Sequence, residues 1–310
     1  MVRERTLLWE YNPVAAQEAL RDEGAMPAIS VENIRFSYGK LEALKGISFT
    51  VAPGEVLGFL GPNGAGKSTT IKILTGQLTP QAGVAQVLGL DVTKERTAFK
   101  ARIGVCFEEK NLYQAMSGEE NLRFFASLFG VRQPDVMGLL QQVGLADRAR
   151  DRVSQYSKGM RQRLMMARAL INNPEVLFLD EPTEGLDPVS AQTIRGIIQE
   201  QAERGVAVLL TTHDMWEADE LSDRVAFINE GQLYAIDTPE VLKLQHGKRA
   251  VRVRRQQDGA VSEVVVPLET PEAGQQLKEA VSAPGLLTIH TEEATLEEVF
   301  IQMTGRGLRG

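Results

Sequence analysis

Residues 56–68 read Val-Leu-Gly-Phe-Leu-Gly-Pro-Asn-Gly-Ala-Gly-Lys-Ser, and this stretch decides the fold. Its apolar first part, Val56 to Leu60, predicts a buried strand. The second part fits the pattern G-x-x-x-x-G-K-[ST], and a helix-forming stretch from Lys67 to Thr75 follows it. Glycines let a backbone wrap around a phosphate without side-chain collision, and the amides at the start of the next helix point at that anion. The stretch therefore predicts a strand, a phosphate-binding loop and a helix.

The residue types in the loop predict separate roles at a nucleotide. Lys67 would reach the β- and γ-phosphates, and the Ser68 hydroxyl would hold magnesium. The rest of the predicted cradle consists of Gly61, Pro62, Asn63, Gly64, Ala65, Gly66 and Thr69.

A second apolar run, Val176 to Leu179, ends in two adjacent carboxylates, Asp180 and Glu181. Ligands bind at the carboxyl ends of parallel strands, so both side chains are candidates for the same site. Asp180 would support magnesium, and Glu181 would polarise the attacking water as a general base. Alone, such a pair is equally typical of a solvated turn; together with the phosphate loop it indicates nucleotide hydrolysis.

Strand patterns alternate with helical ones along the chain, which predicts an α/β fold with a largely parallel sheet. We expect an N-terminal extension at 1–27, a main domain at 28–240 and a small C-terminal α+β domain at 241–310. Leu122, Phe125, Leu128 and Phe129 lie at helical spacing, and we interpret this stripe as core.

Bulk composition limits the classes of function. The 310 residues carry a formal net charge of −7, which disfavours general nucleic-acid binding. The basic run at 248–255 alternates with apolar residues and predicts a half-buried strand. Cys106 is the single cysteine, so no intrachain disulfide is possible. No apolar stretch approaches the roughly 18 residues that span a bilayer, and 1–10 lacks the apolar core of a signal peptide. We expect a cytoplasmic protein.

The segment Tyr156-Ser157-Lys158-Gly159-Met160-Arg161-Gln162-Arg163 connects the chain to a known family. It resembles the signature sequence of ABC ATPases, usually written L-S-G-G-Q, and it precedes Asp180 by about 20 residues, as in that family. Ser157 is also a good N-cap for the following helix, and an ordinary capped helix is the alternative interpretation. The resemblance implies that Ser157 and Gly159 contact the γ-phosphate of an ATP held by a second subunit.

Further segments match the family in the expected order, from about 28 to 239. Asp187 resembles the residue of the loop that crosses the dimer interface, and His213 the switch histidine that contacts the γ-phosphate. Tyr38 resembles the aromatic residue that stacks on adenine, with a surface turn tyrosine as the alternative. The family fold is a P-loop NTPase core with a mostly parallel sheet, an antiparallel β subdomain and a helical subdomain, here at about 109–173.

The sequence departs from the family pattern in two places. Glu108 occupies the position where a glutamine usually ends a strand. We expect its carboxylate either to bind magnesium directly or to swing toward a basic residue when nucleotide is absent; a side chain that points to solvent is the alternative. The signature carries Lys158 and Met160 in place of Gly and Gln. The segment from Ala294 to Phe300 resembles the C-terminal segment of ATPases that serve drug, sodium or polysaccharide exporters; an amphipathic helix is the alternative.

The resemblance implies an ATP- and Mg²⁺-dependent ATPase subunit that dimerises, as a homodimer, around two ATP and powers export through a multi-pass membrane permease. The helical region at about 117–144 would relay the motion, and the chain would lie on the inner face of the cell membrane. The alternative is a soluble ABC ATPase in translation or DNA maintenance. One cassette and no heptad insertion favour the transporter. Small-molecule kinases and GTPases with the same loop lack the signature segment.

Overall fold

The computed structural model describes residues 26–107, 111–247, 250–257, 260–292 and 294–305. The chain divides into two compact units, Met1–Ile236 and Asp237–Gly310. The sequence placed this boundary after residue 240, which lies inside helix α9 (Pro239–His246). The expected N-terminal extension at 1–27 lies almost wholly outside the described residues. Glu108 also lies outside them.

A six-stranded sheet forms the centre of the first unit, in the order β10-β9-β3-β8-β7-β6. The neighbouring pairs from β9 through β3, β8 and β7 to β6 are parallel. All residues of β3, β7 and β8 are buried, which explains their continuous apolar runs. The strands are β3 (Val56–Leu60), β6 (Ile103–Cys106), β7 (Val176–Asp180), β8 (Ala207–Thr212), β9 (Arg224–Asn229) and β10 (Gln232–Asp237).

A second, antiparallel sheet of the same unit has the order β2-β1-β4-β5. It consists of β1 (Ile29–Tyr38), β2 (Leu41–Val51), β4 (Ala82–Val87) and β5 (Leu90–Asp91). Strands β4 and β5 had no clear sequence signal, because they are short and Gly83 and Gly89 interrupt the pattern. Both expected sheets are therefore present.

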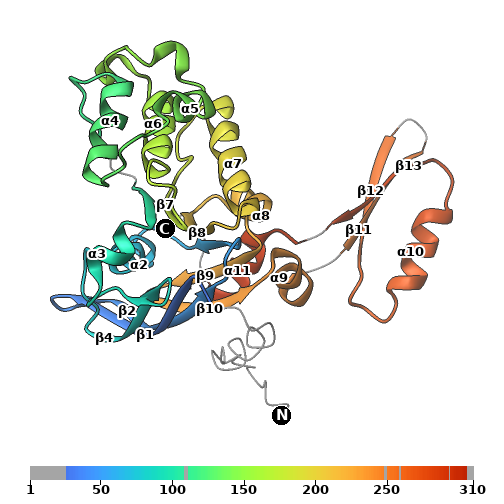
Figure 1. Cartoon of the computed structure of the whole chain (residues 1–310). Helices are drawn as coiled ribbons and strands as arrows, with labels where there is room; N and C mark the ends of the chain where they lie inside the picture. The colour runs from blue at the N-terminus through green and yellow to red at the C-terminus, as the bar shows by residue number, and fades with distance from the viewer. Residues whose placement is uncertain (1–25, 108–110, 248–249, 258–259, 293, 306–310) are drawn as a thin grey trace. The chain divides into compact units, whose positions relative to one another are not determined.

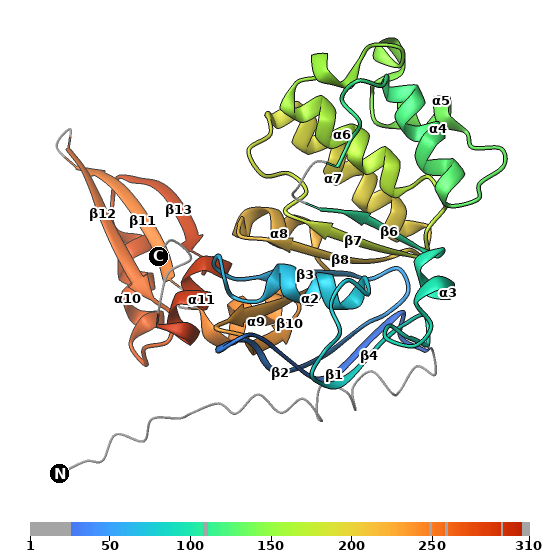
Figure 2. The same cartoon turned by 90° about the vertical axis from the view of Figure 1, so that its left-hand side faces the viewer.

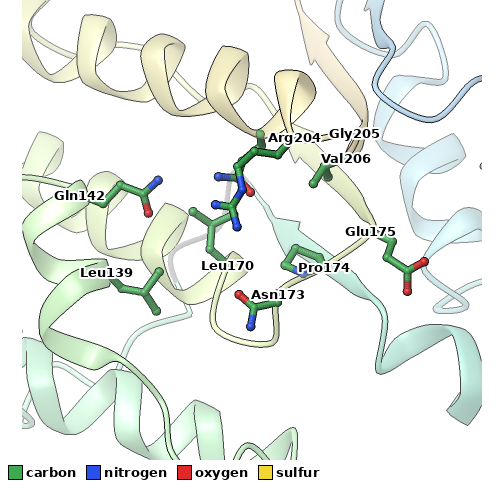
Figure 3. A pocket seen from close by; sticks show the side chains of 10 residues that line it. Leu139, Gln142, Leu170, Asn173, Pro174, Glu175, Arg204, Gly205 and Val206 are labelled. Atoms are coloured by element: carbon green, nitrogen blue, oxygen red, sulfur yellow. The ribbon is translucent and has the colours of Figure 1, made fainter.

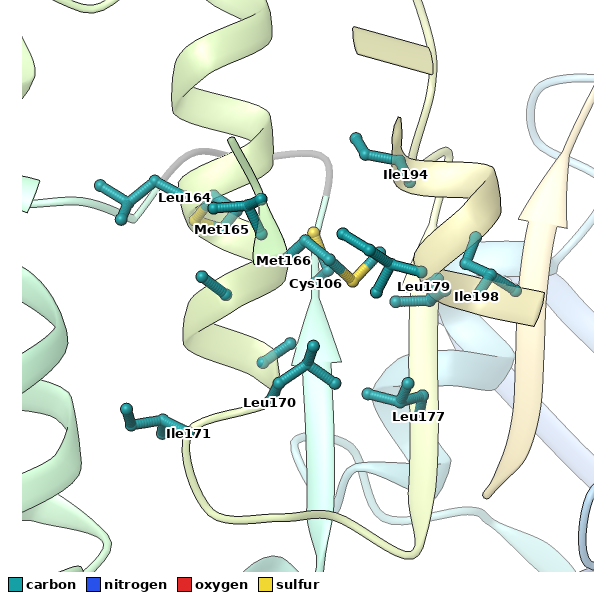
Figure 4. Close-up of a cluster of buried hydrophobic side chains, with 14 of the residues drawn as sticks. Cys106, Leu164, Met165, Met166, Leu170, Ile171, Leu177, Leu179, Ile194 and Ile198 are labelled. Carbon is teal, nitrogen blue, oxygen red and sulfur yellow. The ribbon is translucent and has the colours of Figure 1, made fainter. Parts of the chain in front are cut away.

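Helices cover the six-stranded sheet on one side, and the antiparallel sheet lies on its other side (Figures 1 and 2). The covering helices are α4 (Gly118–Leu128), α5 (Val136–Gln142), α6 (Lys158–Ala169) and α7 (Pro188–Glu203). Side chains of α6 and α7 meet Cys106 and strand residues Leu177 and Leu179 in one apolar cluster (Figure 4). This core fixes the helical region to β6 and to β7, the strand that ends with Asp180.

Among the residues of the first unit that the structure describes, three further α-helices are present: α2 (Lys67–Leu74), α3 (Arg96–Lys100) and α8 (Met215–Leu221). Helix α2 packs between the two sheets with Ile71 and Leu74 in a second apolar cluster. None of the helices in the described part of the chain is long and apolar enough to cross a membrane.

The interpretation of the α4 stripe as core was wrong at its carboxyl end. Leu122 is fully buried, but Leu128 is 65% and Phe129 41% exposed. Tyr113, 50% exposed, packs edge to face on Phe124, and Phe124 packs in the same way on Phe125. We call this group, Tyr113, Phe124, Phe125, Leu128 and Phe129, the aromatic surface.

The described part of the second unit contains a three-stranded antiparallel sheet of order β12-β11-β13 and three α-helices. Its elements are α9, β11 (Ala250–Gln257), β12 (Ala260–Pro267), α10 (Ala273–Ser282), β13 (Leu286–Glu292) and α11 (Leu296–Thr304). Val251 and Val253 are buried, whereas Arg252 and Arg254 pair with Glu263. This confirms the half-buried strand predicted from the basic run.

Candidate nucleotide-binding and hydrolysis site

The loop between β3 and α2 follows a path that requires glycine. A Cβ at Gly61 would lie 2.0 Å from the Ile228 carbonyl oxygen, and Gly66 has φ 114°. The loop is also held from outside, because the Gly231 amide donates to the Ala65 carbonyl at 2.9 Å. These contacts leave the backbone curled at the carboxyl end of β3, the position where a phosphate would be bound.

Lys67 and Ser68 project from the first turn of α2 into the same place. The Lys67 ammonium, on a side chain only 6% exposed, donates to the Gly61 carbonyl at 2.5 Å. The Ser68 hydroxyl donates to Asp180 Oδ1 at 3.2 Å. Residues 112 positions apart in sequence are thereby joined, because β3 and β7 both end at this edge of the sheet.

Asp180 and Glu181 are anchored to the neighbouring strand through Thr211. The Thr211 hydroxyl donates to Asp180 Oδ1 at 2.6 Å and accepts from the Glu181 amide at 3.2 Å. Glu181 has φ 49°, a conformation that costs a non-glycine residue energy and is found mainly where neighbouring structure enforces it. Asp180 therefore faces Ser68, while the Glu181 carboxylate turns toward Lys67 and His213.

The Glu181 carboxylate is shared between two basic groups. Its Oε1 lies 3.3 Å from Lys67 Nζ, which compensates its charge although no hydrogen bond forms there. Its Oε2 lies 3.0 Å from Nδ1 of His213. Because a carboxylate only accepts, Nδ1 carries the proton in this contact. The His213 side chain remains 48% exposed.

The signature residues form a separate group with Asp187. Ser157 caps α6 by accepting from the Met160 amide at 3.2 Å. Asp187 caps α7 by accepting from the Ser190 amide at 2.9 Å, and this bond lowers the pKa of its carboxyl. A Cβ at Gly159 would lie 2.9 Å from Asp187 Oδ2, so the two segments touch. Each of the two capping hydrogen bonds lies within the first turn of its own helix.

Tyr38 ends β1 and is 46% exposed, with its ring edge to face on Phe36. The sequence analysis assigned no role to Thr211, Thr183 or Glu217, which connect β7 to β8 and α8. The signals for Thr211 were its place at the end of a buried strand and in the segment of the switch histidine, His213.

A pocket of about 220 Å³ lies elsewhere, at the amino ends of β7 and β8, with Leu139, Asn173, Pro174 and Val206 in its walls (Figure 3). Because Asp180 and Thr212 lie at the opposite ends of these strands, the pocket is separate from the candidate site.

Comparison with known proteins gives a consistent result. A family model described as ABC transporter matches residues 44–184. The chain is 48% identical over 289 residues to the fluoroquinolones export ATP-binding protein of Mycobacterium tuberculosis H37Rv, covering 90% of this chain and 94% of that protein. It is 33% identical over 309 residues to the linearmycin resistance ATP-binding protein of Bacillus subtilis, covering 91% of this chain and 99% of that protein.

Solved structures show the same likeness in three dimensions. The structure of an ATP binding subunit of an ABC transporter aligns with TM-score 0.66 and 28% identity, covering 71% of this chain and 93% of that one. A dimeric post-hydrolysis state of an ATP-binding cassette, bound to ADP and Pi, aligns with TM-score 0.62 and 25% identity, covering 68% of this chain and 98% of that one.

Proposed function

The chain belongs to the ABC transporter family as an ATP-binding and ATP-hydrolysing subunit, and we propose that it powers export through a multi-pass membrane permease. The relatives named above are an export protein and a resistance protein, which favours this role over that of an ABC ATPase in translation or DNA maintenance. The protein would lie on the inner face of the cell membrane, held there by the permease.

The arrangement of Glu181 between Lys67 and His213 carries the proposal for hydrolysis. Lys67 would bind the β- and γ-phosphates from the loop of 61–69, with Tyr38 stacked on adenine. Glu181 would accept the proton of the attacking water, and His213 would hold Glu181 in place through Nδ1 and contact the γ-phosphate with its exposed edge. Charge developing on the phosphate would be met by Lys67.

Magnesium fits the residues beside the loop. The Ser68 hydroxyl and the Asp180 carboxylate are hard oxygen ligands, which Mg²⁺ prefers, and they lie within hydrogen-bond distance of each other. Glu108 would add a third oxygen from the segment after β6. When bound, the ion would neutralise charge on the phosphate oxygens.

We propose a homodimer with two composite sites. Ser157, Gly159 and Asp187 form their own group and do not hydrogen-bond to the Lys67 loop of the same chain, which fits a role at the nucleotide of a second copy. Ser157 and the start of α6 offer amide groups to an anion. Closure would depend on contacts from both copies, and hydrolysis would remove them.

The aromatic surface is the proposed contact with the permease. Leu128 and Phe129 are exposed apolar side chains beside the partly buried ring of Phe125, over which Arg168 stacks at 4.8 Å. Exposed apolar patches of this kind mark interaction sites. Because α4 packs on the core that also holds β6 and β7, a movement of these strands would be transmitted through α4 to the permease.

The test is purification of the full chain from detergent-solubilised membranes, followed by assay of ATP-driven export. We expect a multi-pass protein in near-equal amount, and export that Glu181→Gln abolishes. Leu128→Asp should release the permease while ATPase activity persists, whereas Met137→Asp, at an exposed site on α5, should not. A chain that hydrolyses ATP but copurifies with ribosomes or DNA would support the alternative.

A further inference from the structure

Glu217 is an acidic side chain in an unusual environment. It lies on α8, four residues after His213, and is only 1% exposed. Glutamate is almost never this buried unless it is partnered. Burial raises the pKa of its carboxyl, and the role proposed above for the site makes no use of it.

Two threonine hydroxyls on different segments donate to this carboxyl. The Thr183 hydroxyl donates to Glu217 Oε1 at 2.5 Å, and Thr212 contributes a second side-chain hydrogen bond. Thr183 lies two residues after Glu181, and Thr212 directly precedes His213. One carboxyl therefore joins the segment that follows β7 to the end of β8, beyond the last paired residues Asp180 and Thr211.

The position of this bridge matters because of what the two segments carry. Glu181 sits at φ 49°, and its carboxylate meets His213 at 3.0 Å. The last bond of the ladder runs from the Glu181 amide to the Thr211 carbonyl at 3.1 Å, so the pairing of β7 with β8 fixes the backbone up to Glu181 but not the segments that follow the two strands. An error of about 1 Å at a reacting group can cost about a hundredfold in rate.

We propose that Glu217 is a positioning residue for ATP hydrolysis, which holds Glu181 and His213 at their working separation through Thr183 and Thr212. It touches neither nucleotide nor water itself. The inference rests on the role proposed above for Glu181 as general base.

The experiment compares three variants of the full chain: Glu217→Leu, which removes both acceptor oxygens, Thr183→Val, and their combination. Glu220→Leu, at an exposed position of the same helix, is the matched control. Each protein is measured for ATP turnover, ATP affinity and unfolding temperature. We expect turnover to fall about tenfold to a hundredfold in Thr183→Val and Glu217→Leu, with ATP affinity within about threefold of the parent. The double variant should lose little more than the worse single one, because both changes break one link.

Turnover within twofold of the parent in Thr183→Val and Glu217→Leu would overturn the inference. Parallel loss of ATP affinity and of thermal stability would also overturn it, since that pattern indicates a general structural role. If Glu217→Leu does not fold, Thr183→Val, which keeps the side-chain volume, decides alone. If Glu181→Gln hydrolyses ATP as fast as the parent, the proposed general base is wrong. That result is distinguishable from a failure of the inference about Glu217.

Discussion

Lys67 and Glu181 form an ion pair inside the site, with Nζ 3.3 Å from Oε1 and side chains only 6% and 9% exposed. The two groups proposed to hold the γ-phosphate and to activate water are thus direct neighbours. A bound phosphate that attracts the Lys67 ammonium would weaken the ion pair between Lys67 and the Glu181 carboxylate. The carboxylate would then be a better base when nucleotide is bound, which links phosphate binding to hydrolysis.

Glu181→Gln should keep ATP binding and nearly stop turnover, because an amide cannot accept the proton of the attacking water. The amide is similar in size and can still accept from His213. Turnover should fall about a hundredfold to ten-thousandfold, whereas ATP affinity should stay equal or rise, since Lys67 no longer pairs with a carboxylate.

Steady-state ATPase rates and nucleotide titration check this prediction. Glu184→Gln, an exposed position in the same loop, is the control and should leave both unchanged. If Glu181→Gln retains turnover within about threefold of the parent, the assignment of the base is wrong.

Ser157→Arg should block ATP-dependent dimerisation and leave ATP binding by each chain intact. A bulky cation would stand where the second copy must approach the γ-phosphate. The substitution also removes an N-cap, which costs about 0.5–2 kcal/mol of stability. Ser157→Ala loses the same cap without added bulk and should still dimerise. Both variants are made in a chain that also carries Glu181→Gln, and their dimerisation with ATP is measured by light scattering. Equal dimerisation of Ser157→Arg and Ser157→Ala would contradict a composite site.

Much of the site was predictable, because parallel strands end at one edge of a sheet. Lys67, Asp180 and His213 are far apart in sequence, yet each follows a buried strand, and the structure brings Lys67 and His213 to Glu181, the residue after Asp180. The family resemblance added the group of Ser157, Gly159 and Asp187, which composition and spacing alone do not connect.

Other features had no sequence signal. The seven-residue helix α8 is too short and too acidic for a clear period, so the burial of Glu217 was not foreseeable. The prediction that the α4 stripe is core failed for the opposite reason. Leu128 and Phe129 follow the helical period, but the helix ends there and leaves them exposed. Periodicity predicts a face, and what covers that face depends on the rest of the protein.

Stability should depend on pH through Glu217. The pKa of this carboxyl is raised in the folded state, mainly by burial and also by Asp214, while Arg195 and the two threonine hydroxyls oppose the shift. Its contribution to stability is therefore fully present below the unfolded pKa of about 4.5 and is lost as the pH rises through the folded value.

An amide does not titrate in this range, so Glu217→Gln should remove the loss of stability that the parent shows as the pH rises. The unfolding temperature of the variant minus that of the parent should increase from pH 4.5 to pH 8, whatever its value at the lower pH. Glu220→Gln should give a constant difference over the same range. A difference that falls with pH would mean that the folded pKa of Glu217 is lowered.

The second unit should be dispensable for binding ATP. None of the candidate nucleotide residues lies beyond Asp237, and the unit has an apolar cluster of its own around Val251 and Val253. A chain that ends at Asp237 keeps β10 whole, so it should fold and bind ATP within about threefold of the parent's affinity. A chain that ends at Leu244 should be less stable, because Leu242 is 2% exposed on α9, which packs on α11, and would be uncovered. Nucleotide titration and thermal unfolding of the two truncated chains test the boundary: loss of ATP binding in a folded chain ending at Asp237 would show that the second unit belongs to the site.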